Sequence, residues 1–155
     1  YEYRLSWNDF KGHPDIGAQH AALTSTMIEA GFEQKNNDVT FFISSYFIPA
    51  DSWVKSKGDY LLNHEQRHFD LAEIYARKLR QQLMTHQFGK HSVQNDFKKI
   101  YTEITTELRH AQELYDIETH HSLKKDEQER WDRMIDNQLN ALEDYQDVRI
   151  AIKAR

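Results

Sequence analysis

The chain has 155 residues, of which 39% are hydrophobic and 29% charged, with a net charge of −5 and no cysteine. This composition is typical of a globular chain long enough to bury a core. The lack of cysteine excludes disulfides, thiolate catalysis and cysteine-ligated zinc. Acids and bases are interspersed, and the sequence has no Gly-rich phosphate loop and no apolar run of about 18 residues, which argues against nucleic-acid, nucleotide and membrane-spanning functions.

The first third of the chain predicts β-structure. Residues 1–7 (YEYRLSW) alternate apolar with polar side chains, as a strand does. Residues 23–34 (LTSTMIEAGFEQ) and 39–48 (VTFFISSYFI) are rich in β-branched and aromatic residues, and the KNND segment at 35–38 between them is typical of a turn. We therefore expect a β-hairpin within a small antiparallel sheet of three or more strands.

The remainder predicts three helices. After Gly58 the chain has a single glycine, Gly89, and no proline, and its apolar residues recur at steps of three and four. We expect helices over 58–87, over 92–119 and from about residue 122 onward. Apolar positions assigned to the third helix are Trp131, Ile135, Leu139, Leu142, Tyr145, Val148 and Ile152. The fold class that follows is α+β, one domain over 1–155, with the sheet packed on the first helix and two long helices behind.

The first of these helices carries the sequence HEQRH at residues 64–68. His64 and His68 lie about 40° apart around a helix, so two imidazoles can grip one ion, and Glu65 lies about 100° from His64, within reach of a water on that ion. The same side of the helix carries Leu61, Ala72, Tyr75, Ala76, Leu79 and Leu83. The opposite side, expected to be solvated, carries Gln66, Arg67, Asp70, Glu73, Arg77 and Gln81.

This inward placement favours a metal site over a satisfied pair of core histidines, although both interpretations stay open. An inward carboxylate without a partner costs several kcal/mol, and a divalent cation with its bound water removes that cost. Two imidazoles, a third protein ligand and one water make a catalytic zinc (Zn²⁺) site, in which the metal lowers the pKa of the water from 15.7 to about 7. Glu65 is then the general base and afterwards the general acid.

The third ligand is expected from elsewhere in the chain, because HEQRHFDLAEI lacks the further Gly and His of the HExxHxxGxxH pattern. The junction of the second and third helices offers four candidates: Asp116, Glu118, His120 and His121. The alternative is a solvated helix end, where histidines meet the helix dipole favourably.

The sequence resembles a bacterial domain family of unknown function described as predicted secreted zinc-dependent proteases. The resemblance rests on LSWNDFKGHP, AALTST, FIPADSWVK, LLNHEQRHFDLAEIYARKL, YDIETHHS and QERW, and it extends over nearly the whole chain. It implies a zincin-like metallopeptidase exported from the cell, with its HExxH residues at His64, Glu65 and His68. A Tyr-Asp-x-x-Thr-x-His run falls on residues 115–121, so the resemblance selects His121 as the third zinc ligand. Ser122 stands where the family often has glycine.

Further roles are expected around this centre. Tyr115 is a candidate oxyanion donor, with plain core packing as its alternative, and Asp116 is a candidate for orienting a ligating imidazole. The segment VTFFISSYFIP at 39–49 is our nominee for an exposed strand edge that receives an extended peptide. Trp53 and Tyr46 are candidates for lining the groove.

The predicted function is that of a zinc metallopeptidase, secreted or periplasmic, acting on a peptide or protein substrate, with no nucleic acid and no membrane span. The chain begins at Tyr1 without methionine, so we expect a mature or trimmed fragment from which a signal peptide has been removed. Competing predictions are an inactive metal-binding or scaffold domain, a zinc hydrolase of other amides, and a helical interaction module without metal.

Overall fold

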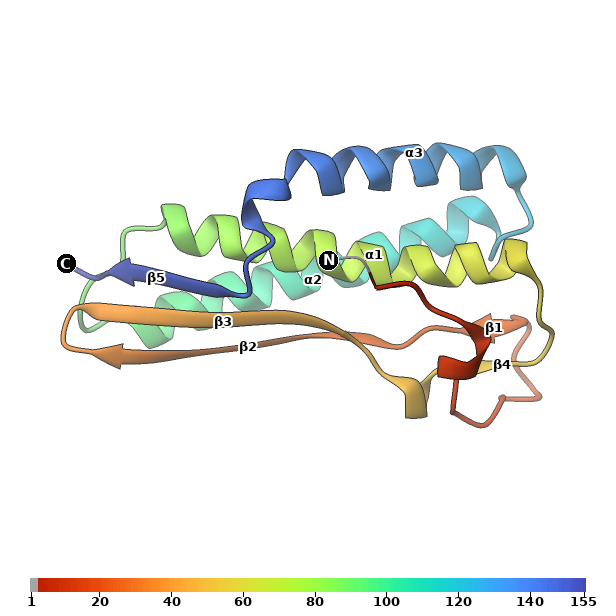
Figure 1. Ribbon diagram of the computed structural model, residues 1–155, viewed down its shortest axis with the longest axis horizontal. Coiled ribbons are helices and arrows are strands. Elements are labelled where there is room, and N and C mark those ends of the chain that lie inside the picture. The colour runs from red at the N-terminus through yellow and green to blue at the C-terminus, as the bar shows by residue number, and fades with distance from the viewer. Residues whose placement is uncertain (1–2) are drawn as a thin grey trace.

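The computed structural model describes residues 3–155, whose helices and strands form an α+β structure (Figure 1). The strands are β1 (Ala22–Leu23), β2 (Thr26–Lys35), β3 (Asp38–Phe47), β4 (Trp53–Val54) and β5 (Arg149–Lys153). The helices are α1 (Asp59–Thr85), α2 (Val93–Thr119) and α3 (Lys125–Ala141), with short 3-10 turns at Trp7–Asp9, Pro49–Asp51 and Glu143–Tyr145. The predicted fold class, a small antiparallel sheet with three helices, is confirmed at this level.

The predicted hairpin is also confirmed. Strands β2 and β3 pair antiparallel from Thr26 with Phe47 to Lys35 with Asp38, which leaves Asn36 and Asn37 as a two-residue loop. Asn36 has a φ of 58°, in the left-handed region that asparagine tolerates and that tight hairpin turns require. A local signal, the Asn-Asn pair between two β-prone runs, was therefore sufficient to locate this element.

The third strand of the sheet comes from the C-terminus, where we had predicted helix. Helix α3 ends at Ala141, and Arg149–Lys153 forms β5, which pairs with β3 from Asp38 opposite Lys153 to Phe42 opposite Arg149. The side chains of Ile150 and Ile152 alternate with polar neighbours, which is strand periodicity. The helical interpretation of Tyr145, Val148 and Ile152 was wrong. These residues continue the three- and four-residue spacing of the apolar residues in α3, so the sequence pattern alone did not show where the helix ends.

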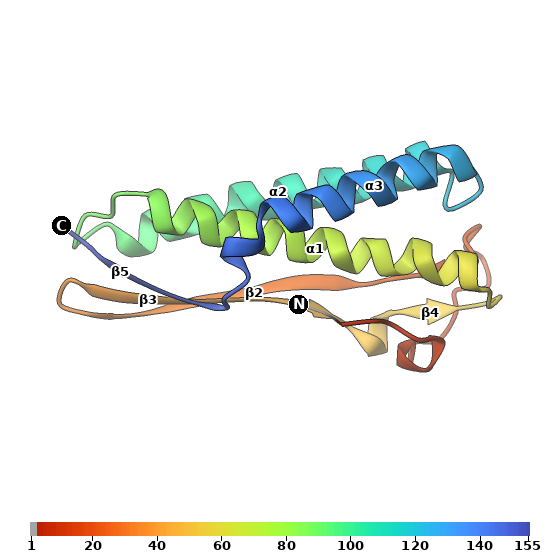
Figure 2. The ribbon, with the colours of Figure 1, turned by 45° about the horizontal axis from the view of Figure 1, so that its top comes forward.

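Helix α1 lies in the middle of the structure, with the sheet on one side and α2 and α3 on the others (Figures 1 and 2). The expectation of a solvated polar face is therefore wrong. Gln66, Asp70, Glu73 and Arg77 are all buried, because α3, the sheet and the N-terminal segment cover this face. Charged members of this face are paired inside the protein: the Glu73 carboxylate accepts from Arg77 Nε and from Arg80 Nη1, each at 3.0 Å.

The N-terminal segment forms no strand in the part that the structure describes, contrary to the expectation for residues 1–7, of which Tyr1 and Glu2 lie outside the described residues. It runs along α1, where the Gln66 side chain accepts from the Leu5 amide at 2.7 Å and donates to the Tyr3 carbonyl at 3.1 Å. Leu5 and Phe10 pack against Phe69 of α1. A helix side chain thus supplies the hydrogen bonds that a neighbouring strand would otherwise have given.

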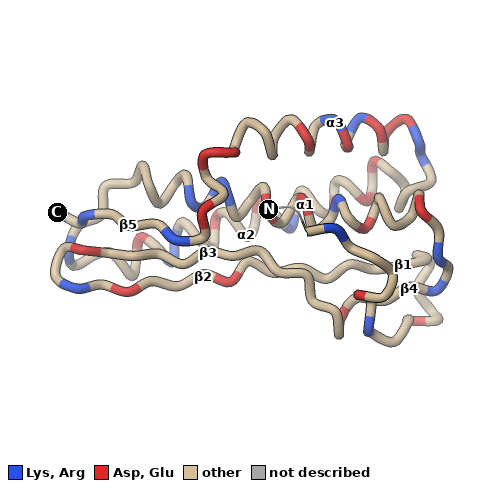
Figure 3. Tube along the Cα trace, in the orientation of Figure 1, with Lys and Arg blue, Asp and Glu red and all other residues tan. Residues whose placement is uncertain are grey.

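Helices α1 and α2 begin and end within a few residues of their predicted bounds. Ser92 precedes α2, accepts the Asp96 amide at its carbonyl, and bonds the Asp96 carboxylate through its hydroxyl. Charged residues of both signs are spread over all three helices and the sheet (Figure 3). None of the helices in residues 3–155 combines the length and the apolar character needed to cross a bilayer.

Candidate metal centre

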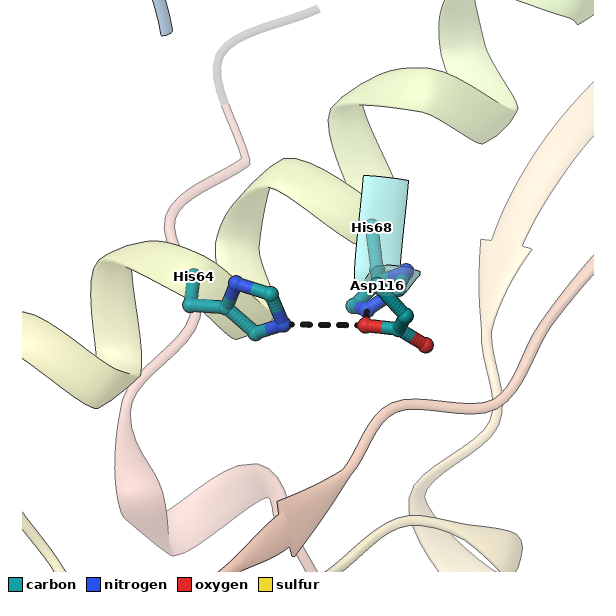
Figure 4. Close-up of side chains that lie close together, drawn as sticks. All are labelled: His64, His68 and Asp116. Atoms are coloured by element: carbon teal, nitrogen blue, oxygen red, sulfur yellow. Dashed lines mark hydrogen bonds and ion pairs between the residues drawn. The ribbon is translucent and has the colours of Figure 1, made fainter. Parts of the chain in front are cut away.

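Two turns of α1 present His64 and His68 to one carboxylate of α2. Asp116 Oδ1 lies 3.1 Å from His64 Nε2 and 2.9 Å from His68 Nε2 (Figure 4). Both imidazoles are buried, whereas Asp116 is partly exposed. Within the described chain this trio is the group of histidine and carboxylate side chains whose ligand atoms come close enough together to hold one metal ion.

The other ring nitrogen of each histidine is held by a glutamine that the sequence analysis missed. Gln128 of α3 places its Oε1 2.8 Å from His64 Nδ1, and Gln112 of α2 places its Oε1 at His68 Nδ1. The remaining bonds fix both amides: Gln128 Nε2 donates to Tyr115 Oη and Asp132, and Gln112 Nε2 donates to the His68 carbonyl at 2.9 Å. Both glutamine oxygens must therefore accept, so both histidines carry a proton on Nδ1.

This tautomer is the one that metal binding through Nε2 requires. With Nδ1 protonated, a neutral His64 and a neutral His68 both point an Nε2 lone pair at the Asp116 oxygen, which is unfavourable unless a cation lies among them. Either extra protons on the imidazoles or a divalent cation removes that conflict. Two imidazoles and a carboxylate, each imidazole bonded behind to an amide oxygen, fit zinc.

The charges of the cluster are strongly coupled. Burial disfavours the charged form of His68, but the hydrogen bond and charge of Asp116, with the charge of Glu65, outweigh it and raise the pKa of His68 to about 9. For Asp116, burial acts to raise the pKa, and the hydrogen bonds from His64 and His68 overcome it, so the net shift is downward. Without metal, the cluster is held by the attraction between protonated His68 and ionised Asp116.

A pH dependence follows for the metal-free protein. Because folding raises the pKa of His68 from 6.5 to about 9, its protonation contributes stability that is complete below pH 6.5 and is lost as the pH rises through 9. We expect the free energy of unfolding, measured with urea in the presence of a chelator, to fall between pH 6.5 and 9. His68→Gln should flatten this part of the profile. An equal slope in the variant and the parent would contradict the assignment.

His121, the predicted third ligand, lies beside this trio. Its Nδ1 is 3.5 Å from Asp116 Oδ1, and its exposed ring packs against His20 with 4.1 Å between the centroids and 37° between the ring planes. Of the other candidates, Glu118 accepts from Trp131 Nε1 at 2.7 Å, and the exposed His120 ends α2. Asp116 and His121 are thus the two candidates that face the histidine pair.

The turn that carries His121 has an unusual backbone. His120, His121 and Ser122 have φ values of 46°, 52° and 83°, so three successive residues other than glycine adopt the left-handed conformation. Each such residue costs about 1–2 kcal/mol. This left-handed turn ends α2 after Thr119 and directs residue 121 back toward α1.

Ser122 offers a direct test of this strain. Ser122→Gly removes the left-handed penalty but adds about 0.5–1 kcal/mol of unfolded-state entropy, so we expect a net gain in unfolding free energy of up to about 1 kcal/mol. Ser122→Val keeps the penalty and branches at Cβ, so we expect a loss of about 1–2 kcal/mol. Urea unfolding of both variants measures the difference. Equal destabilisation by Gly and Val would show that the turn relaxes in solution.

The trio opens into a cleft of about 540 Å³. Residues 20–28 form one wall, α2 forms the other, and His64, Glu65 and His68 lie at its base. The buried Glu65 carboxylate accepts from the Thr24 hydroxyl at 2.5 Å. His20, to which the sequence analysis gave no role, lines the same cleft and has a buried Nδ1 without a hydrogen-bond partner among the described residues.

Several residues predicted to act around the site have surroundings that do not fit those roles. The Tyr115 ring stacks on His64, but its buried hydroxyl donates to the His64 carbonyl at 3.0 Å and accepts from Gln128 at 2.7 Å. An oxyanion role would require this hydroxyl to leave both partners. Trp53 is buried in β4, and neither it nor Tyr46 lines the cleft. The nominated edge, 39–49, is wrong because β3 is the central strand, between β2 and β5.

Comparison with known proteins adds a family match. No curated protein and no solved structure matches the chain. The family match covers residues 50–122, so it is narrower than the resemblance inferred from the sequence: it leaves out the N-terminal segment, the hairpin and α3. It includes His64, Glu65, His68, Asp116 and His121. Over residues 50–122, a little under half of its length, the chain matches the family described as bacterial protein of unknown function (DUF922).

Proposed function

We propose that this protein is a zinc-dependent metallopeptidase with a zincin-like site, in which His64 and His68 hold the metal. The observation that carries the proposal is the pair of Nδ1-protonated imidazoles, which converge through Nε2 on a carboxylate at the base of a cleft. Asp116 or His121 supplies the third ligand, since both lie against the pair. A bound Zn²⁺ would supply Lewis acidity, lowering the pKa of a coordinated water to about 7.

Glu65 is the residue proposed to move the proton. It follows His64 directly on α1, its carboxylate lines the cleft, and the Thr24 hydroxyl holds one of its oxygens. The other carboxylate oxygen is free of any hydrogen bond to the described residues, so it is available to the attacking water. Glu65 takes the proton of that water as the nucleophile adds to the carbonyl carbon, and returns it to the amine nitrogen as the bond to carbon breaks.

A peptide substrate is favoured by the backbone of the cleft wall. The Ser25 amide donates to Ser52 Oγ and its carbonyl accepts from the Ile48 amide, so both groups point away from the cleft. By the alternation of an extended chain, the amides and carbonyls of Thr24 and Thr26 point the other way. Strand β2 pairs with β3 alone in the described sheet. The Ile28 carbonyl accepts from the Tyr101 hydroxyl at 2.9 Å, so the edge offered to an extended peptide is the part before it, at Thr24 and Thr26.

A second candidate function has its own observation. The protonated His68 and the ionised Asp116 satisfy each other electrostatically, as a structural ion pair in a helical interaction module would. In that case the cluster needs no metal. Two further candidates share the zinc site. A metal-binding scaffold differs from the peptidase because it has no turnover, and a hydrolase of other amides differs from it in substrate.

Two measurements on untagged protein separate these candidates. Zinc content by elemental analysis should be close to one equivalent, whereas less than about 0.1 equivalent favours the interaction module. Zinc-loaded protein should then cut an unfolded protein substrate, with new termini detected by mass spectrometry, and a chelator should stop the cutting. Bound zinc without any cleavage would favour the scaffold.

An exported location, implied by the resemblance, remains part of the proposal, and secretion of the full-length gene product tests it.

A further inference from the structure

A carboxylate of α3 lies one hydrogen bond behind the metal centre. Asp132 Oδ1 accepts from Gln128 Nε2 at 2.9 Å, and the same glutamine holds His64 Nδ1 at 2.8 Å through its Oε1. Gln128 is only 2% exposed, so water does not compete for its amide. The contacts run from α3 back to the histidine of α1.

Asp132 is itself held by the helix that carries His64. Asn63 Nδ2 donates to its Oδ2 at 3.0 Å, and Arg67 Nε donates to its Oδ1 at 3.1 Å. The interactions therefore close a ring that leaves α1 at His64, passes through Gln128 and Asp132, and returns to α1 at residues on either side of that histidine. Such a ring fixes the position of each of its members more firmly than a single contact does.

The ring determines which way the glutamine amide points. An ionised carboxylate only accepts hydrogen bonds, so Asp132 requires the NH₂ group of Gln128 to face it. The amide oxygen then faces His64 and accepts its Nδ1 proton, which leaves Nε2 as the nitrogen for a cation. The hydrogen bond from Gln128 to the charged Asp132 is stronger than its bond to the neutral Tyr115 hydroxyl. Both bonds favour the same orientation of the amide.

We propose that Asp132 is a positioning residue of the metal centre, which acts through Gln128 to fix the Nδ1-protonated tautomer and orientation of His64. The inference rests on the metal site of the proposed function, though not on peptidase activity. It also places part of the centre in α3, which lies outside the 50–122 segment that matches the bacterial family.

The test is the zinc dissociation constant, measured by competition with a chelator. Removing the direct partner of a ligating imidazole usually raises this constant about 10- to 100-fold. Asp132 acts through that partner, so we expect Asp132→Ala to raise it about 10-fold, the lower end of this range. Asp132→Asn keeps an acceptor for Gln128 and should retain most of the affinity. Gln128→Met removes the direct partner of His64 and should weaken zinc binding at least as much as Asp132→Ala, and adding Asp132→Ala to it should weaken zinc binding little further.

Asp136 provides the matched control. It lies one turn further along α3 and pairs with the same Arg67, at 2.7 Å, but the structure gives it no bond to Gln128. Asp136→Ala should therefore change the zinc dissociation constant less than about 2-fold. Unfolding free energies of the metal-free variants, measured alongside, separate a loss of zinc affinity from a general loss of stability.

The outcomes separate this inference from the proposed function. If the parent protein binds no zinc, both fail together. If the parent binds zinc but Asp132→Ala and Asp136→Ala weaken binding equally, only the role of Asp132 fails. Should Asp132→Ala not fold, Gln128→Met decides: parent-like zinc affinity in that variant would overturn the inference.

Discussion

Replacing Glu65 by glutamine is expected to lower kcat for peptide cleavage by the zinc-loaded protein about 10²- to 10⁴-fold. The substitution keeps the shape of the side chain, and its amide oxygen still accepts from the Thr24 hydroxyl that holds the carboxylate at 2.5 Å. What it removes is the ability to take and return a proton. Zinc content should stay at one equivalent, because Glu65 does not contact the position where the two imidazoles converge.

Glu113 is the control for that experiment. Its exposed carboxylate lines the same cleft from α2, so Glu113→Gln changes the local charge by the same amount. We expect the kcat of this variant to stay within about 3-fold of the parent, because the ordinary effect of a surface charge is small. A parent-like rate in Glu65→Gln would remove the catalytic assignment.

Replacing Arg80 by methionine is expected to lower the free energy of unfolding by about 3–5 kcal/mol. Arg80 is 1% exposed and donates to the Ile43 carbonyl through Nε and Nη2, at 3.2 and 2.9 Å. Its Nη1 donates to Glu73 and to the Tyr145 carbonyl, each at 3.0 Å. Methionine fills a similar volume but removes these donors: the Ile43 carbonyl loses both bonds from Arg80, and the buried Glu73 carboxylate keeps Arg77 as its remaining cationic partner.

Arg130 is the matched control, because its ion pairs with Glu118 and Glu127 lie at the surface. Arg130→Met should cost at most about 1 kcal/mol in the same urea unfolding experiment. Similar losses in the two variants would mean that the buried pairing of Arg80 contributes no more than a surface pair. Because Arg80 joins α1 to β3 and to the connection before β5, its loss should also weaken the packing of α1 on the sheet.

The parts of the fold that the sequence predicted are those with local signals. The hairpin follows from two β-prone runs around Asn36 and Asn37, and α1 and α2 follow from apolar residues at helical spacing. Strand β5 was missed because it exists only by pairing with β3, 107 or more residues earlier in the chain, and its few residues also continue a helical period. The buried polar face of α1 was missed for a similar reason: the sequence of a single helix does not show that other elements pack on both of its faces.

The site shows the same division. His64, Glu65 and His68 share one helix, so their spacing alone predicted that they act together. Asp116 was weighed as a candidate because it lies in a cluster of possible ligands, but only the packing of α2 on α1 places it between the two imidazoles. Gln112 and Gln128 lie on two other helices, and a glutamine carries no signal of its own until those helices meet. His20 lines the cleft because the adjacent strand β1 pairs with β4, and no local sequence pattern predicts that pairing.

An anomalous-scattering map at the zinc edge, from crystals of untagged protein grown with zinc, shows whether His64 and His68 hold a divalent cation. We expect one strong peak at about 2.1 Å from both Nε2 atoms, with Asp116 or His121 completing the protein ligands. The same map identifies which of these two residues is the third ligand. An absence of anomalous density at this position in crystals grown with zinc, while the two imidazoles remain paired with Asp116, would contradict the claim.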